Sequence, residues 1–184
     1  IFFVGSLSVA FDFDTILECA KLINSNYNNI KFIISGDGEV RNYLETAIKN
    51  QPNIILTGWI DKYQISSIGK RSNLAIAPYK NIKNFSDNIP NKILDYMSLG
   101  LPIVSPLEGE VENLLLNNHI GFKYMEKSPK SLQKLIVNCM SDSKLIDSYA
   151  TNALNLYNKK YSFKSVYDDA VKHLEKIYIQ KNKI

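Results

Sequence analysis

A polar segment near the middle of the chain concentrates the residue types that bind anions and sugar hydroxyls. It reads DNIPNKILDYMSLGLP from Asp87 to Pro102 and places Lys92 between two carboxylates, Asp87 and Asp95. A carboxylate has only acceptors to offer, which suits two neighbouring hydroxyl donors of a sugar, and a lysine suits a phosphate. The types and spacing indicate a site for a phosphorylated sugar, although Asp87 alone could be a helix cap and Asp95 alone a solvated helix residue.

Helical periodicity begins within this segment at Pro90. The first amides of a helix are free to bind an anion, and Lys92 occupies a first turn where the helix dipole would favour an acid. Asn91 and Asp95 are four residues apart and share one face. The predicted buried face consists of Ile89, Ile93, Leu94 and Met97. We therefore expect Ile89, Pro90, Asn91 and Lys92 to form a phosphate site beside the Asp95 carboxylate.

The elements that must position this segment alternate between short β-branched or aromatic runs and longer stretches of helical period. The predicted strands are Ile1–Gly5, Ile30–Ser35, Ile54–Thr57, Leu74–Ala77, Ile103–Ser105 and Gly121–Tyr124. This alternation predicts an α/β fold, a doubly wound, Rossmann-like parallel sheet of six strands. We expect one domain over residues 1–184, with a core at 1–141 and C-terminal helices at 142–184.

Loops that follow the predicted strands carry glycine, and ligands of such sheets bind outside the carboxyl ends of the strands. The candidates for close approach of backbone to a ligand are Gly5, Ser6, Gly36, Gly38, Gly58, Trp59 and Ile60. The alternative for each loop is that its glycine only permits a tight turn.

The last two predicted helices run roughly over Asp142–Lys159 and Phe163–Gln180. The final one carries an apolar stripe at three- and four-residue spacing, so it should pack on its own domain or on a partner domain. Its basic character leaves open a peripheral contact with an anionic membrane surface.

Composition excludes several classes of protein. The chain has 184 residues, 45% hydrophobic and 22% charged, which is typical of a soluble globular protein. The net charge of +4 comes from the tail, since residues 158–184 carry seven basic and three acidic side chains. A neutral body disfavours a nucleic-acid-binding surface. Cys19 and Cys139 lack paired spacing and are predicted to be buried thiols of a reducing compartment.

Metal and other cofactor sites are not expected. Asp12 and Asp14 form a DxD pattern, but they fall where acids are ordinary first-turn residues of a helix. His119 and His173 stand apart from other ligand types. A third glycine of a dinucleotide fingerprint and a Walker lysine are both missing, so neither NAD nor ATP is indicated.

The sequence resembles the C-terminal, donor-binding domain of the retaining GT-B glycosyltransferases called GT4 or group 1. The resemblance runs in order through FFVGSL, ISGDGE, IILTGWID, LAIAPY, PNKILDYMSLGLPIVS, GFKY and the terminal YSF. The PNKILDYMSLGLP segment is similar to the subset that builds surface polysaccharides, including capsule, and glycolipids. Two acids separated by seven residues match Asp87 and Asp95.

The resemblance implies a hexosyltransferase whose donor is a UDP- or GDP-sugar and which needs no metal. Asp87 would contact the transferred sugar as the catalytic residue, and Asp95 the ribose. The turn from Gly58 to Ile60 would hold the nucleobase, with Gly36 to Gly38 nearby. The saccharide or lipid-linked acceptor would bind an N-terminal domain that precedes this chain. The chain alone would therefore transfer little or nothing, and the enzyme would work in the cytoplasm, at the inner face of the membrane if its acceptor is lipid-linked.

One departure from the family pattern concerns charge. Many members carry an Arg and a Lys in the loop after the first strand, where this chain has Ser6 and Phe11. We expect the diphosphate to depend on the helix N-terminus, on Lys92 and on Lys80 or Lys83. Two alternatives stay open: a non-catalytic nucleotide-binding or regulatory module, and one half of a sugar-nucleotide epimerase.

Overall fold

The computed structural model describes residues 1–27 and 29–181 and contains one parallel sheet. Its strands are β1 (Phe2–Val4), β2 (Phe32–Ser35), β3 (Ile54–Gly58), β4 (Ala75–Ile76), β5 (Ile103–Ser105) and β6 (Gly121–Lys123). Their order is β3-β2-β1-β4-β5-β6 and every neighbouring pair is parallel. The predicted six-stranded, doubly wound sheet is confirmed. Strands β1, β2, β4 and β6 are shorter than predicted, β5 has the predicted bounds, and β3 is one residue longer.

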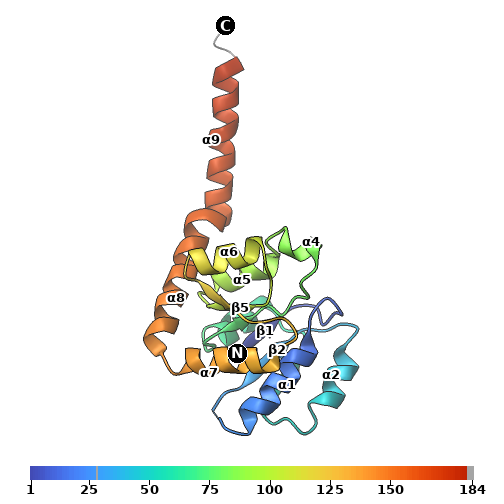
Figure 1. The fold of residues 1–184 in the computed structure, drawn as a ribbon. Helices are drawn as coiled ribbons and strands as arrows, with labels where there is room; N and C mark the ends of the chain where they lie inside the picture. Colours follow the sequence, from blue (N-terminus) through green and yellow to red (C-terminus); the bar gives the residue numbers. More distant parts are fainter. Residues whose placement is uncertain (28, 182–184) are drawn as a thin grey trace.

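Helices cover both faces of the sheet. Figure 1 shows α1, α2 and α7 on one side and α5 and α6 on the other. The helices before the C-terminal pair are α1 (Phe13–Asn24), α2 (Arg41–Ala47), α3 (Lys62–Gly69), α4 (Lys83–Ser86), α5 (Asn91–Ser98), α6 (Glu110–Asn117) and α7 (Pro129–Met140). The four-residue helix α4 interrupts the connection between β4 and α5. Buried aliphatic and aromatic side chains fill the two layers between helices and sheet.

Local signals in the sequence set several helix ends. Asp61 caps α3 through a capping box with Gln64, and Ser128 caps α7 with Pro129 at its first position. Gly100 follows the end of α5 with φ +64°, the left-handed conformation that glycine adopts without strain. These caps fix where α3 and α5, the two helices beside the site, begin or end.

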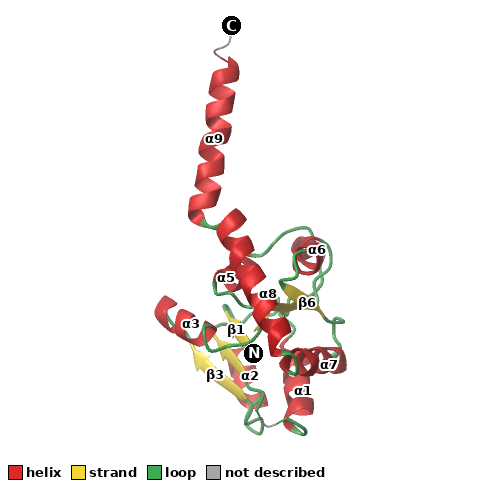
Figure 2. Cartoon of the chain, turned by 90° about the vertical axis from the view of Figure 1, so that its left-hand side faces the viewer, coloured by secondary structure: helices red, strands yellow, loops and turns green. Residues whose placement is uncertain are grey.

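The C-terminal helices are α8 (Ser143–Leu156), a π-helical turn η1 (Tyr157–Tyr161) and α9 (Phe163–Lys181). Helix α8 crosses the domain and contacts α5 and α7, whereas α9 extends away from the body (Figure 2). No residue of α9 among those described is buried, and Phe163 and Leu174 are 74% and 65% exposed. Packing on its own domain, one of the two expectations for this helix, is therefore not seen among the described residues, and packing on a partner domain stays a prediction.

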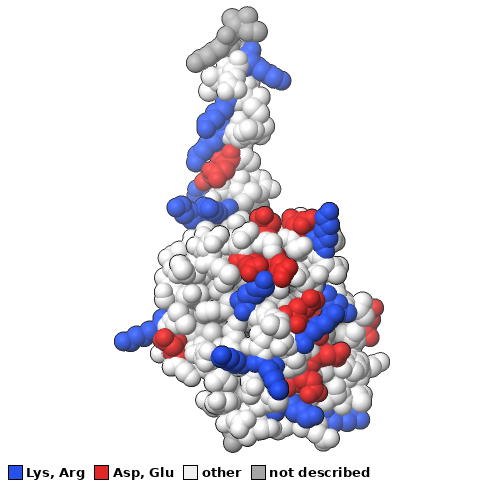
Figure 3. All heavy atoms as spheres, viewed as in Figure 1, with Lys and Arg blue, Asp and Glu red and all other residues white. Residues whose placement is uncertain are grey.

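Charges of both signs are interspersed over the body on the face seen in Figure 3. Ion pairs account for part of this pattern, for example Lys123 with Glu112 at 2.9 Å. Within the described part of the chain, no helix is both long and apolar enough to cross a bilayer. Cys19 and Cys139 are buried free thiols as predicted, and burial raises their pKa values to about 12 and about 11.

Candidate functional site

The sheet reverses its direction of winding between β1 and β4. From β1 the chain proceeds outward through β2 to β3, and from β4 it proceeds the other way through β5 to β6. Loops on the two sides of such a switch point diverge and leave a crevice at the carboxyl ends of the strands, where ligands of this fold bind. A large cavity opens at this point.

This switch-point cleft has a volume of about 710 Å³. Its lining residues are Val4, Gly5, Ser6, Phe11, Lys62, Ile65, Ser66, Tyr79, Asn91, Lys92, Asp95, Ser98 and Leu99. Five of the predicted site residues are among them, drawn from the loop after β1 and from α5. The size fits the range of small-molecule sites, and the mixture of apolar walls with a few polar groups is typical of them.

An adjoining cavity of about 370 Å³ continues the cleft toward β2 and β3. It shares Val4, Gly5, Ser6 and Ile65 with the cleft and adds Gly36, Asp37, Trp59 and Ile60. The loops after β1, β2 and β3 thus meet, as the positions of their glycines predicted. Trp59 is 75% exposed at this end, so its ring is free to contact a ligand.

Two predicted glycines support the cavities without lining them. A Cβ at Gly38 would lie 2.8 Å from the backbone nitrogen of Leu7, which shows how closely the two loops pack. Gly58 ends β3 with φ +73°, and its carbonyl accepts a hydrogen bond from the Gly36 amide at 2.8 Å. Their role in this structure is to bring the loop backbones together.

Helix α5 supplies the polar wall of the cleft. Its N-cap is Pro90, which has no side-chain acceptor for the first-turn amides, and Asn91 and Asp95 are both exposed on the cleft side. Ile89 and Pro90 precede the helix and do not line the cavities. Burial raises the pKa of Asp95, and the neighbouring Lys92 opposes that shift.

The predicted buried face of α5 is only half right. Ile93 and Met97 are fully buried, whereas Ile89 and Leu94 are half-buried. The other buried members of the helix are two residues that the sequence interpretation left out, Lys92 and Tyr96. The inward face of the helix is rotated, because Lys92 and Tyr96 both bind the backbone of β1.

Lys92 turns its ammonium down onto the end of β1. The residue is 8% exposed, and Nζ donates a hydrogen bond to the carbonyl of Val4. Burial lowers the pKa of Lys92 to about 8, while the charge of Asp95 acts in the opposite direction. The buried Lys92 ammonium has few groups nearby that stabilise its charge, so an anion bound in the cleft would stabilise it.

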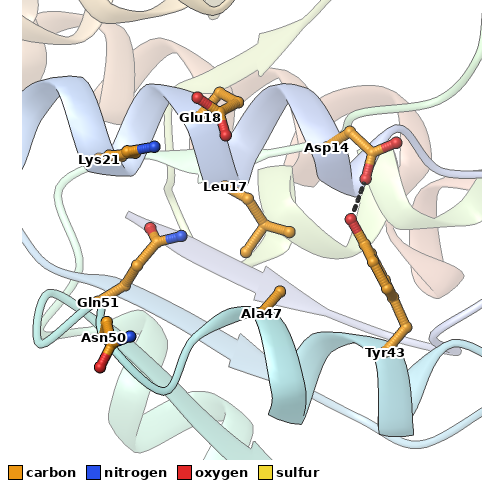
Figure 4. A pocket seen from close by; sticks show the side chains of 8 residues that line it. All are labelled: Asp14, Leu17, Glu18, Lys21, Tyr43, Ala47, Asn50 and Gln51. Carbon is orange, nitrogen blue, oxygen red and sulfur yellow. Dashed lines mark hydrogen bonds between the residues drawn. The ribbon is translucent and has the colours of Figure 1, made fainter.

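The carboxylates of Asp12 and Asp14 both accept hydrogen bonds within the protein. The Asp12 carboxylate caps α1 by accepting from the Thr15 amide and hydroxyl, and Asp14 accepts from the Tyr43 hydroxyl at 2.6 Å. Asp14 borders a separate cavity of about 420 Å³ that runs between α1 and α2 (Figure 4). Among the residues described, no group of three or more His, Cys, Asp or Glu could hold a metal ion.

Comparison with known proteins decides the family. The sequence profile described as "Glycosyl transferases group 1" matches residues 1–142. The chain belongs to the group 1 glycosyltransferase family. Over 172 residues it is 23% identical to the chitobiosyldiphosphodolichol beta-mannosyltransferase of Candida albicans, an alignment that covers 86% of this chain and 37% of the relative.

Solved glycosyltransferase structures have the same fold. A mutant of S. aureus TarM in complex with Fondaparinux, alpha-GlcNAc-glycerol and UDP superposes with TM-score 0.76 at 16% identity, over 93% of this chain and 34% of that one. The C-terminal domain of the group 1 protein LpcC from Francisella tularensis superposes with TM-score 0.70 at 18% identity, over 88% and 85%. The present chain spans about a third of the length of the curated relatives it matches.

Asp87 stands apart from the cavities of this glycosyltransferase domain. It is exposed at the C-terminal end of α4 and lines neither the cleft nor its extension. The last residue of α4, Ser86, packs against Gly109, whose φ is +68° and whose Cβ, if present, would collide with the backbone of Ser86. The structure brings Lys92 and Asp95 together at the switch point and leaves Asp87 outside both cavities.

Tyr96 is the functional candidate that sequence reasoning missed. Its hydroxyl is fully buried, accepts from the Val4 amide at 3.1 Å and donates to the Ile76 carbonyl at 3.2 Å. It therefore joins β1 to β4 at the switch point of the glycosyltransferase sheet. The signal available in the sequence was its spacing of four residues from Lys92, which places both side chains on one face.

Proposed function

We propose that this chain is the donor-binding half of a retaining hexosyltransferase and that a UDP- or GDP-sugar binds in the switch-point cleft. The observation that carries the proposal is the meeting of Lys92, Asn91 and Asp95 with the loop after β1 in one cavity. The diphosphate lies at the N-terminus of α5 near Lys92, the ribose on Asp95, and the base between Gly36 and the Trp59–Ile60 turn. UDP is bound in the TarM complex that shares the fold, which supports this assignment.

The cleft provides what glycosyl transfer needs at the leaving group. The transition state develops positive charge at the anomeric carbon and negative charge on the departing diphosphate. Preorganised amides of the α5 first turn and the Lys92 ammonium stabilise that negative charge, and no metal is required for it. Asp87, which is exposed at the C-terminal end of α4, contacts the transferred sugar after the donor is bound.

The rest of the enzyme follows from the same proposal. The acceptor, a saccharide or a lipid-linked saccharide of surface-polysaccharide or glycolipid synthesis, binds a separate N-terminal domain. The exposed apolar stripe of α9 contacts that domain, and the isolated chain has little or no transferase activity. Buried free thiols at Cys19 and Cys139 fit a reducing compartment, so we place the enzyme in the cytoplasm, at the inner membrane face for a lipid-linked acceptor.

Calorimetric titration of the purified chain with UDP, GDP and their sugars tests the donor assignment. At least one nucleoside diphosphate should bind, and Asp95→Ala should weaken it about tenfold or more, because hydrogen bonds to a charged group contribute about 1.5–3 kcal/mol. Asp147→Ala is the matched control, since Asp147 is an exposed helical carboxylate on α8, outside the cleft. Absence of binding at millimolar nucleotide, or equal loss in both variants, would contradict the proposal.

The role of Asp87 needs a separate measurement. Asp87→Ala should leave the affinity for the nucleoside diphosphate unchanged and weaken the affinity for the nucleotide-sugar, because in this proposal Asp87 contacts only the sugar. In the full-length enzyme the same change should abolish transfer. Donor binding by a full-length enzyme that transfers nothing to any saccharide acceptor would instead favour the non-catalytic module.

A further inference from the structure

The Lys92 ammonium lies among aromatic rings from three segments of the chain. Nζ is 4.4 Å from the ring centroid of Phe3, 5.2 Å from that of Phe11 and 5.9 Å from that of Tyr96. These distances fall within the range of about 6 Å over which a ring face attracts a cation. Among the described residues, the only hydrogen bond that Nζ donates goes to the Val4 carbonyl. The ring faces therefore replace much of the stabilisation that the ammonium had from water before it was buried.

Backbone forms the floor beneath this ammonium. Gly5 has φ +144°, and a Cβ built on it would collide with Lys92 Nζ. The ammonium thus rests directly on the end of β1, in the space that any other residue at position 5 would fill. A side chain at position 5 would displace this ammonium, and the φ of +144° would strain any residue other than glycine.

Phe11 differs from the other two rings in its position. Phe3 belongs to β1 and Tyr96 is fixed by two backbone hydrogen bonds, and both are completely buried. Phe11 comes from the loop after β1, is 9% exposed and lines the cleft. An antiparallel bridge with Tyr79, whose ring centroid is 4.6 Å away, holds it in place. Phe11 is therefore the ring that closes the surroundings of Lys92 on the ligand side.

The ionisable groups near Lys92 stabilise its charge only in part, so the aromatic rings have a large effect on it. Asp95 is the anion beside it on α5, and Lys62 of α3 is a second cation in the lining of the cleft. Burial raises the pKa of Tyr79 to about 12 and raises that of Tyr96 further, so both phenols are neutral near pH 8. Burial disfavours the charged form of Lys92. A ring face favours the charged form, because the quadrupole of the ring attracts a cation.

We propose that Phe11 is a positioning residue: its ring, with those of Phe3 and Tyr96, seats the charged Lys92 ammonium over Gly5 and so sets the affinity of the cleft for a diphosphate. The second half of this statement depends on the function proposed above. The first half concerns the ligand-free chain alone and can be measured without any nucleotide.

The test compares Phe11→Leu with a matched control, Phe13→Leu. Phe13 belongs to the same cluster, with its ring centroid 5.1 Å from Phe3 and 5.9 Å from Phe11, and is 4% exposed. It has no cation–π contact with Lys92 among those found in the structure. Both changes remove a ring from the core, but only one removes a ring that faces the ammonium.

The first readout is the pKa of Lys92, which is measured by NMR titration of the chain carrying isotopically labelled lysine. The Lys92 signal is assigned by its absence from the spectrum of Lys92→Arg. Phe11→Leu should lower this pKa by about half to one unit, the equivalent of one cation–π contact. Phe13→Leu should leave it unchanged, and Phe11→Tyr, which restores a ring face, should return it to the wild-type value. An unchanged pKa of Lys92 in Phe11→Leu, or an equal fall in both leucine variants, would overturn the proposal that the Phe11 ring positions the ammonium. If Phe11→Leu does not fold, Phe11→Met provides the same comparison.

The second readout is the affinity for UDP and GDP at pH 6.5 and pH 8.5. Phe11→Leu should weaken binding about two- to tenfold at pH 8.5, where fewer chains carry a charged Lys92, and less at pH 6.5. An affinity equal to that of Phe13→Leu at both pH values would show that the ring does not set diphosphate affinity. If the wild-type chain binds no nucleotide, the proposed function is contradicted. The pKa comparison would still decide whether the Phe11 ring positions the Lys92 ammonium.

Discussion

Replacing Lys92 with methionine should stabilise the ligand-free chain while it weakens diphosphate binding. Burial lowers the pKa of Lys92 from its ordinary value of 10.5 to about 8. At about 1.36 kcal/mol per pH unit, this difference corresponds to roughly 3 kcal/mol. At pH 7 the lysine is charged in both the folded and the unfolded chain, so the folded state carries this penalty in full.

Methionine recovers only part of that free energy. Its unbranched side chain fits the space of the lysine stem, but it leaves the Val4 carbonyl without its donor, at a cost of about 1 kcal/mol. The expected net gain in unfolding free energy at pH 7 is about 1–2 kcal/mol. The same variant should bind UDP or GDP about ten- to a hundredfold more weakly, because a charge-assisted phosphate contact contributes about 1.5–3 kcal/mol.

The pH dependence of stability gives the sign of the effect. Between about pH 8 and 10.5 the unfolded chain holds a proton on Lys92 that the folded chain has lost. Stability linked to this group therefore rises with pH across that window, and it is flat below and above it. Lys92→Met should lack this rise.

Urea denaturation at pH 7, 8, 9 and 10 measures both effects from the midpoints at constant m-value. Lys62→Met is the control, because Lys62 is an exposed lysine in the lining of the same cleft and its loss should change stability by less than about 0.5 kcal/mol. A Lys92→Met chain that is less stable than wild type at pH 7, or that keeps the rise between pH 8 and 10.5, would refute this account of the buried charge.

Three further changes test the framework of the site. Tyr96→Phe removes two buried backbone hydrogen bonds and should lower the unfolding free energy by about 1–3 kcal/mol in urea, whereas an unchanged midpoint would mean that the hydroxyl does not join the strands. Gly36→Ala places a Cβ against the Gly5 carbonyl at φ +138° and should cost more than about 2 kcal/mol and abolish nucleotide binding, which calorimetry and denaturation check together. Leu174→Ser should change the melting temperature of the chain negligibly, since this side chain is 65% exposed, and a clear loss would show that α9 packs on the body.

Much of the fold could be read from the sequence because the signals are local. Periods of two and of about three and a half residues mark strands and helices wherever they lie, and the caps at Asp61 and Ser128 act within a single turn. The glycines after β1, β2 and β3 marked the loops that meet at the cavities, because parallel strands end on one side of a sheet.

The direction of individual side chains could not be read in the same way. Helix α5 has apolar residues on more than one side, so its own pattern leaves open which side faces the sheet. The strands decide this, because the backbone of Val4 can bind Lys92 and Tyr96 together, across 88 and 92 residues of sequence. Phe11 was noticed only as a missing basic residue, although its ring lies beside a lysine supplied by another segment.

The sequence by itself determined the class of fold, the order of its elements and the segment that carries the polar groups of the cleft. Only the tertiary structure decided that Lys92 is buried against rings and backbone, that Asp87 lines neither cavity, and that no described residue of α9 is buried. The physical reason is range. Helix and strand formation depend on neighbours within a few residues, whereas burial, charge stabilisation and packing depend on which distant segments come to lie opposite one another.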